Sequence, residues 1–168
     1  EDLSGKLVVI HTNDMHGRYA ADSKEGSLGM STVTALKGYY QKQGANVLLL
    51  DAGDFSQGTN LVNYYKGLDA IYFMNAAGYD AASLGNHEFD FGLDALKAMS
   101  YAAQFPILDA NILNKETGEP YLQDHTVFTF KNMKVGVFGL DTPETQTKAN
   151  PKNVKDIYIL AGAELYAC

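Results

Sequence analysis

The sequence predicts an α/β fold in which a mainly parallel sheet is flanked by helices and followed by a C-terminal hairpin. In the first half of the chain, short apolar segments alternate with segments of helical periodicity, which is the pattern of βαβ units and a parallel sheet. Polar residues cluster directly after each of the first four strand-like segments. The second half lacks this alternation and contains two strand-like runs joined by a short turn.

The elements of the first half are defined by the spacing of their apolar residues. The predicted strands are four short apolar runs, Lys6–Ile10, Asn46–Leu50, Ala81–Leu84 and Phe105–Leu108. The predicted helices repeat apolar residues every three or four positions and cover Gly29–Gln43, Leu68–Ala77 and Gly92–Tyr101. Gly44 and Gly78 stand directly after the first two helices, where glycine commonly ends a helix.

The second half is predicted to contain turns, a hairpin and a loop. Residues Asn114–Pro120 are rich in turn-forming residues. Thr126–Phe130 and Lys134–Leu140 read as two strands joined by a three-residue turn, and we expect this hairpin to join the sheet. Thr142–Lys155 is polar, and we expect it to form a loop.

Composition and charge limit the classes of function. The chain has 168 residues, which fits one domain. Its net charge of −7, with Arg18 as the only arginine, argues against binding of polymeric nucleic acid. The longest apolar run, Val47–Leu50, is too short to span a membrane. Cys168 is the only cysteine, which excludes an internal disulfide and a cysteine-based zinc site. The chain begins with Glu1 and Asp2 and shows no signal peptide, so we expect a processed or truncated form.

The polar clusters after the four predicted strands are candidates for a functional site. The carboxyl ends of parallel strands share one edge of a sheet, and ligands bind at that edge in such folds. Side chains that are distant in the sequence should therefore converge there. The side chains expected at this edge are Asp14, His16, Asp54, Asn86, His87 and Asn111.

This set of side chains favours a metal site. Carboxylates buried together are costly without a partner, and a divalent ion removes that cost. Mixed nitrogen and oxygen ligands suit zinc, manganese, iron or cobalt. Asp54 lies in the middle of the series and could bridge two ions, which two-metal sites hold about 3.5–4 Å apart for phosphate displacement. The alternative is a hydrogen-bonded polar network, in which His87 and Asp90 only cap a helix.

Two further residues are candidate substrate contacts. Arg18 closely follows the first polar cluster and could grip a phosphate, although a surface ion pair explains it equally well. Asn111 could contact the substrate or support the ligands, or it could be an ordinary turn residue. The sequence leaves both alternatives open.

Three motifs resemble those of the calcineurin-like metallophosphoesterases. They are Asp14-Met15-His16, Gly53–Gly58 (GDFSQG) and Gly85–Asp90 (GNHEFD), each placed after a predicted strand. The longer forms Thr12–Arg18 and Gly85–Asp90 resemble the bacterial 5′-nucleotidase and 2′,3′-cyclic phosphodiesterase branch in particular. The likeness runs from about residue 7 to about residue 154. It identifies the chain as resembling the N-terminal portion of such a domain, with a layered metallophosphoesterase fold.

The resemblance implies a role for each matching residue. The implied metal ligands are Asp14 and His16 for the first ion, Asn86 for the second, and Asp54 for both. His87 would stabilise the phosphoryl oxygens or the leaving group, oriented by Asp90. Family members hydrolyse nucleoside monophosphates and other small phosphate esters with a water activated by two divalent ions. Candidate ions are zinc, manganese, magnesium, cobalt and calcium. The resemblance also implies an extracellular, periplasmic or cell-wall-associated protein.

The second half departs from the family pattern. The family carries two further histidine ligands for the second ion and a glutamine for the first, whereas the only histidine after Asn111 is His125. Residues 156–168 have no clear match to the family. We therefore expect an incomplete domain, truncated to its first half, that retains one metal ion. The parent protein would be a nucleotidase, and the alternatives for this chain are a catalytically impaired fragment or half of a split protein completed by another chain.

Overall fold

The structure is a computed structural model that describes residues 2–24 and 26–161. Its central feature is a four-stranded sheet in the order β1-β2-β3-β4, and all neighbouring strands are parallel. The strands are β1 (Leu7–Thr12), β2 (Asn46–Asp51), β3 (Ala81–Ser83) and β4 (Ile107–Leu108). The predicted parallel α/β fold is therefore confirmed. The polar clusters follow the carboxyl ends of these strands and share one edge of the sheet.

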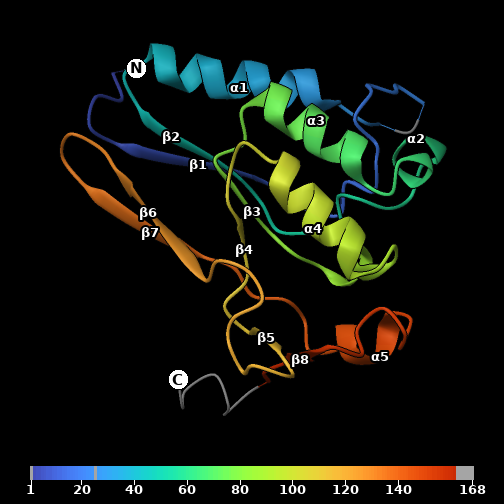
Figure 1. Cartoon of the computed structure of the whole chain (residues 1–168). Coiled ribbons are helices and arrows are strands. Elements are labelled where there is room, and N and C mark those ends of the chain that lie inside the picture. Colours follow the sequence, from blue (N-terminus) through green and yellow to red (C-terminus); the bar gives the residue numbers. More distant parts are fainter. Residues whose placement is uncertain (1, 25, 162–168) are drawn as a thin grey trace.

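The helices between these strands lie together on one side of the sheet (Figure 1). They are α1 (Met30–Lys42), α3 (Leu68–Ala77) and α4 (Leu93–Ala102), with the short α2 (Asn60–Tyr64) before α3. The three longer helices match the predicted ones to within a residue. Gly78 ends α3 in the left-handed conformation with φ 75°, as predicted from its position.

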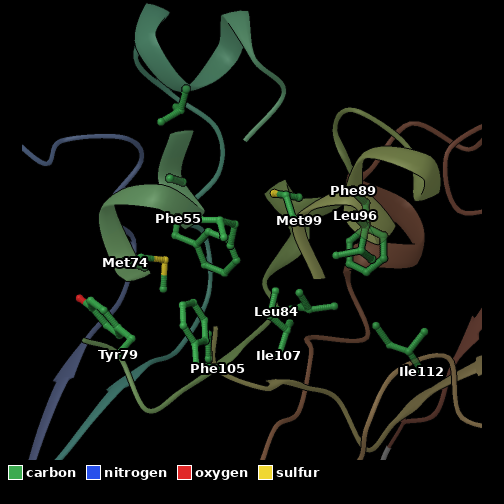
Figure 2. Close-up of a cluster of buried hydrophobic side chains, with 14 of the residues drawn as sticks. Phe55, Met74, Tyr79, Leu84, Phe89, Leu96, Met99, Phe105, Ile107 and Ile112 are labelled. Atoms are coloured by element: carbon green, nitrogen blue, oxygen red, sulfur yellow. The ribbon is translucent and has the colours of Figure 1, made fainter. Parts of the chain in front are cut away.

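The hydrophobic core fills the space between the sheet and these helices. Figure 2 shows Phe55 and Phe89 among the buried side chains, together with Met74 and Met99 from α3 and α4. Phe55 follows Asp54, and Phe89 lies two residues after His87. Burial of such a side chain is worth about 1.5–3 kcal/mol. The two phenylalanines therefore anchor the loops that carry the predicted site.

The hairpin of β6 (His125–Thr129) and β7 (Lys134–Phe138) is present and antiparallel. The prediction that it joins the sheet is wrong, because it forms a separate two-stranded sheet. Its base is held at the end of β4, where the Ala110 N–H donates to the Gly139 carbonyl at 2.8 Å. Near its tip, Asn132 donates to the Gly5 carbonyl at 2.8 Å, just before β1. The hairpin therefore crosses the side of the sheet that the helices do not cover (Figure 1).

The structure adds elements that were not predicted in the second half. β5 (Ile112–Asn114) and β8 (Ile157–Ile159) pair as an antiparallel two-stranded sheet. The predicted loop at Thr142–Lys155 contains the short helix α5 (Thr145–Lys148), so that prediction is wrong in part. Thr145 is buried, which fixes α5 against the rest of the molecule. β8 belongs to the tail at 156–168, and residues 162–168 of that tail lie outside the described residues.

The face of the sheet opposite the helices remains partly open. A cavity of about 370 Å³ lies between the sheet and the hairpin. Its lining includes His11 from β1, Ser83 from β3, and Phe138 and Leu140 from the hairpin side. Val9 on β1 is 50% exposed. No helix in the described ranges is both long and apolar enough to cross a membrane.

Candidate metal centre

The predicted ligands on the first two loops have strained backbone conformations. Asp14, His16 and Asp54 have φ values of 52°, 46° and 59°, in the left-handed region. In the described part of the chain, Lys66 is the one other non-glycine residue with positive φ. Strained residues of this kind gather at functional sites, where the surrounding structure holds them in place. All three are of the types, Asp and His, that enter this region most readily among non-glycine residues.

Backbone hydrogen bonds hold the two loops together. The Asp14 N–H donates to the Gly53 carbonyl at 3.0 Å, and the His16 N–H donates to the Asp54 carbonyl at 3.0 Å. A Cβ at Gly58 would lie 2.4 Å from the His16 carbonyl oxygen, so this close approach requires glycine. The loop after β1 is thus fixed directly against the loop after β2.

Three of the predicted side chains converge. Among the described residues, His16, Asp54 and His87 each offer a ligand atom, and these atoms all lie within 4.8 Å of one another. The imidazole rings of His16 and His87 have centroids 5.1 Å apart and meet edge to face. All three residues are half-buried, so the cluster remains reachable from solvent. Two imidazoles and a carboxylate are a donor set that suits a transition metal ion.

Each histidine of the cluster uses its Nδ1 atom for a protein contact. His16 Nδ1 lies 3.0 Å from the Gln57 carbonyl oxygen, and His87 Nδ1 lies 2.7 Å from Asp90 Oδ2. Metal-binding histidines usually donate one ring N–H to a carbonyl or carboxylate in this way, which orients the other nitrogen toward the ion. These contacts leave Nε2 of both rings available, either to bind a metal ion or to donate a hydrogen bond to a substrate.

Asp14 and Asn86 flank the cluster. Asp14 Oδ1 lies 3.7 Å from His16 Nε2, and the Asp14 side chain is 61% exposed. Asn86 opens the short 3₁₀ helix η1 (Asn86–Phe89) after β3 and is half-buried. The His87 N–H donates to Asp54 Oδ1 at 3.0 Å, which ties η1 to the loop after β2. The third polar cluster is thus joined to the second.

The partner of His87 favours the imidazolium form. Burial lowers the pKa of His87, but the hydrogen bond and charge of Asp90 raise it, as do the charges of Asp54 and Glu88, and the net shift is upward. Asp90 is itself braced, because Asn153 donates to its backbone carbonyl at 2.9 Å. His87 is thereby prepared to carry a positive charge beside an anionic ligand.

The two candidate substrate contacts differ in their surroundings. Arg18 is exposed on the same loop as Asp14 and His16. Asn111 is buried, and its side-chain amide donates to the carbonyls of Asp141 and Leu160 at 2.9 and 3.0 Å. Its Oδ1 accepts from the Asp141 N–H at 2.8 Å. Asn111 therefore braces the second half of the chain, which favours the turn-residue alternative, and its substrate role stays a prediction.

Two buried acidic residues beside the cluster were not singled out from the sequence. Glu88 accepts hydrogen bonds from both the second and the third motif loops, and burial raises its pKa although those bonds oppose the shift. Asp51 accepts from Thr12 Oγ1 at 2.5 Å, and burial raises its pKa to about 7. A signal for Glu88 exists, because it stands three residues after Gly85 at a helix start, the spacing of a capping box.

Comparisons with known proteins agree with this geometry. The sequence matches the calcineurin-like phosphoesterase family over residues 7–162. It is 39% identical over 155 residues to a 5′-nucleotidase of Vibrio vulnificus (strain CMCP6) and 38% identical over 161 residues to the snake venom 5′-nucleotidase of Naja atra. These alignments cover 90% and 88% of this chain but only 28% and 30% of the relatives. The chain thus spans less than a third of the length of these relatives.

A solved structure shows the same fold. The chain is similar to the calcineurin-like phosphoesterase YfkN from Bacillus subtilis, with a TM-score of 0.79 and 29% identity. The likeness covers 94% of this chain and 55% of that one. The family match includes all three motif loops and nearly all of the described residues. The chain belongs to the calcineurin-like phosphoesterase family.

Proposed function

We propose that the protein hydrolyses phosphate esters of nucleotides, with nucleoside monophosphates as the main substrate class, in a metal-dependent reaction. The observation that carries the proposal is the convergence of His16, Asp54 and His87 at the carboxyl edge of the parallel sheet. The 5′-nucleotidase names of the relatives from Vibrio vulnificus and Naja atra support the choice of substrate. The acidic chain, with net charge −7, fits a small ester better than a polyanionic polymer.

The proposed metal ligands fall into two groups. Asp14, His16 and Asp54 would hold the first ion, and Asp54 and Asn86 would contribute to the second. Bound divalent ions supply Lewis acidity, which lowers the pKa of water and neutralises charge on a phosphoryl group. The preferred metal, with zinc and manganese as the first candidates, is part of the proposal and is to be measured.

His87 would act on the substrate itself. With Asp90 holding Nδ1, the opposite ring nitrogen can donate a proton or a hydrogen bond to a phosphoryl oxygen or to the leaving group. In the metal-free chain the pKa of His87 is shifted upward, because the hydrogen bond and charge of Asp90, with the charges of Asp54 and Glu88, outweigh the effect of burial. Removing one donor of this kind typically costs about 10²–10³ in rate. Arg18 remains a candidate contact for the phosphate.

The second candidate function is a fold-competent chain with little or no activity of its own. The observation that favours it is the coverage of 55% of the YfkN chain and 28% of the Vibrio relative. His125, the only histidine after Asn111, is exposed and pairs with Asp124 at 2.9 Å. The second ion would then lack imidazole ligands, unless further polypeptide or another chain supplies them.

A role outside the cytoplasm in nucleotide breakdown is part of the proposal and would be tested by cell fractionation.

Metal binding tests the first step of the proposal. Calorimetry of the metal-free chain with Mn²⁺ or Zn²⁺ should show a specific site, and Asp54→Asn should weaken it at least tenfold, because a charged central ligand is replaced by a neutral one. Asp94→Asn, an exposed control on α4, should bind as the parent chain does. Equal affinity in the Asp54→Asn variant would remove Asp54 from the site.

Catalysis tests the second step. In any longer natural form of the protein, His87→Ala should lower AMP hydrolysis about 10²-fold or more, while the exposed His125→Ala control leaves it unchanged. Hydrolysis that is insensitive to His87→Ala would show that the reaction uses a different site.

A further inference from the structure

Glu88 is a buried carboxylate that the proposed reaction does not use directly. Its side chain is 0% exposed and lies directly after His87 in η1. Acidic side chains are almost never fully buried unless they are paired. Glu88 must therefore have partners in the protein that offset the loss of water.

The partners of Glu88 come from two different loops. Oε1 accepts from the Phe55 and Ser56 N–H groups at 2.9 and 3.0 Å and from Ser56 Oγ at 2.9 Å. Oε2 accepts from the N–H groups of Asp54 and Gly85, both at 2.8 Å. One carboxylate thus joins the loop after β2 to the loop after β3. All of these partners are donors, so the group that they surround must accept hydrogen bonds. An ionised carboxylate only accepts, whereas the amide of Gln also carries two N–H donors.

These contacts bear directly on the geometry of the metal centre. Asp54 is held in the left-handed conformation, and its N–H is one of the groups that Glu88 accepts from. The Asp54 side chain in turn accepts from the His87 N–H. Glu88 is adjacent to His87 in the chain, so these contacts close a small ring. The ring sets the separation and orientation of Asp54 and His87, two members of the converging cluster.

We propose that Glu88 is a positioning residue that pre-forms the metal centre by fixing the Asp54 loop against His87. The inference rests on the proposed metal-dependent function, because it assigns Glu88 a task toward the same ions. Groups that orient metal ligands typically contribute about 10–100-fold to metal affinity when they are removed. A role in fold stability alone would leave affinity and ligand geometry in the folded protein unchanged.

The test compares Glu88→Gln with Glu144→Gln in the chain loaded with Co²⁺. Gln keeps the size of Glu but places an NH₂ group against N–H donors. Glu144, by contrast, is exposed and pairs with Lys148 at 2.6 Å. We expect Glu88→Gln to bind Co²⁺ about 10–100-fold more weakly, with altered visible absorption bands that report ligand geometry. Glu144→Gln should match the parent chain in both. Urea unfolding identifies conditions in which every variant is folded.

A second variant covers the case in which Glu88→Gln does not fold. Ser56→Ala removes one of the donors to Oε1 and leaves the carboxylate in place. We expect a smaller loss of Co²⁺ affinity, about two- to tenfold, with a shift of the same absorption bands. Unchanged affinity and spectrum in a folded Glu88→Gln, or in Ser56→Ala if Glu88→Gln is unfolded, would overturn the positioning role while the metal site stands. No Co²⁺ binding by the parent chain would overturn the metal site and this inference together.

Discussion

Three residues of the candidate site have energetically unfavourable backbone conformations. Asp14, His16 and Asp54 hold left-handed backbones, each at a cost of roughly 1–2 kcal/mol. The cost is met by the backbone hydrogen bonds between the loops and by the buried phenylalanines beside them. The backbone positions of these residues are thereby fixed before any ligand binds, which lowers the conformational entropy lost on binding.

Asp109 and Asp141 are two buried carboxyl groups in the second half of the chain. Asp109 is fully buried, and burial raises its pKa to about 7, with a contribution from the charge of Asp141. Burial likewise raises the pKa of Asp141 to about 6. Asp109 Oδ2 has no hydrogen-bond partner among the described residues. The folded chain therefore favours the protonated acids.

A dependence of stability on pH follows from these shifts. Because the folded pKa of Asp109 lies above the unfolded value of about 3.9, the folded state holds a proton that the unfolded state releases. The free energy of unfolding of the metal-free chain should thus fall as pH rises from about 4 to about 7. Asp109→Asn should raise that free energy by about 1–3 kcal/mol at pH 8 and reduce the pH slope.

Urea unfolding at pH 5, 6.5 and 8 measures this effect. In the Asp109→Asn variant, the new amide oxygen can still accept from the Asn111 and Ile112 N–H groups, as Asp109 Oδ1 does, so the local structure should persist. The exposed Asp94→Asn should leave the slope unchanged. An Asp109→Asn variant that is destabilised at pH 8, or that keeps the parent slope, would contradict the assignment.

The sequence allowed the cluster to be predicted but not the burial of its neighbours. The ligand types and their places after parallel strands were enough to expect Asp54 and His87 at one edge, and the structure brings them together. Whether a second acidic residue in the same motif faces solvent or the core depends on contacts between loops. Glu88 and Asp51 are buried by such contacts. The position of Glu88 three residues after Gly85 marks a helix start but does not show that its side chain is buried.

Among the elements, length and place in the strand–helix alternation decide what could be predicted from sequence. β3 and β4 have only three and two residues, but each follows a predicted helix. The helices α1, α3 and α4 have enough turns for their apolar period to be recognised, and the strand β2 contains the continuous apolar run Val47–Leu50. β5, β8 and α5 have only three or four residues, which is too short for a period. The hairpin was recognised, but its direction across the sheet depends on tertiary contacts of Asn132 and Gly139.

The loops after β2 and β3 also depend on close backbone packing. Gly53 has φ 101°, and a Cβ there would lie 2.5 Å from the Gly85 nitrogen and 2.6 Å from the Leu84 carbonyl carbon. Gly118 also has positive φ, at 71°, but a Cβ there would meet no atom within 4 Å. Alanine variants of Gly53 and Gly118 therefore separate the cost of a left-handed backbone from the cost of steric contact with neighbouring atoms.

Alanine at these two positions should therefore have different costs. Gly118→Ala should lower the free energy of unfolding by about 1–2 kcal/mol, the cost of a left-handed alanine. Gly53→Ala should lower it by about 3 kcal/mol or more, because overpacking against backbone adds to that cost. Urea unfolding of both variants measures the difference. Equal losses would show that the loop after β3 moves away easily, and that the two loops are not rigidly joined.

At the scale of the whole molecule, the two faces of the sheet are covered unequally. Purely parallel sheets are normally buried on both faces. Here α1, α3 and α4 cover one face (Figure 1). The cavity and the half-exposed Val9 mark the open parts of the other face. The YfkN chain extends well beyond the portion that this chain matches. The exposed apolar face of this chain is therefore a surface that further polypeptide or a partner could cover.

The ligand count leads to the last prediction, which concerns the chain as a whole. The first ion would have three protein ligands, Asp14, His16 and Asp54. The second would have only Asp54 and Asn86, a shared carboxylate and a neutral amide, which make a weak site because affinity depends on charged, preformed ligands. In a second copy of the chain, the histidines not used in its own site are His11 and His125. These lie on β1 and at the start of β6, outside the three motif loops.

We therefore expect the 168-residue chain to bind about one metal ion and to hydrolyse AMP hardly above background. Metal content by mass spectrometry and AMP hydrolysis in Mn²⁺ and Zn²⁺ measure both quantities. A second, weakly bound ion should appear only at high metal concentration. The rate of AMP hydrolysis should not rise with it, because the two-metal reaction needs both ions at fixed positions relative to each other. Robust turnover by this chain, lost in His87→Ala and kept in His125→Ala, would show that the residues present already complete the site.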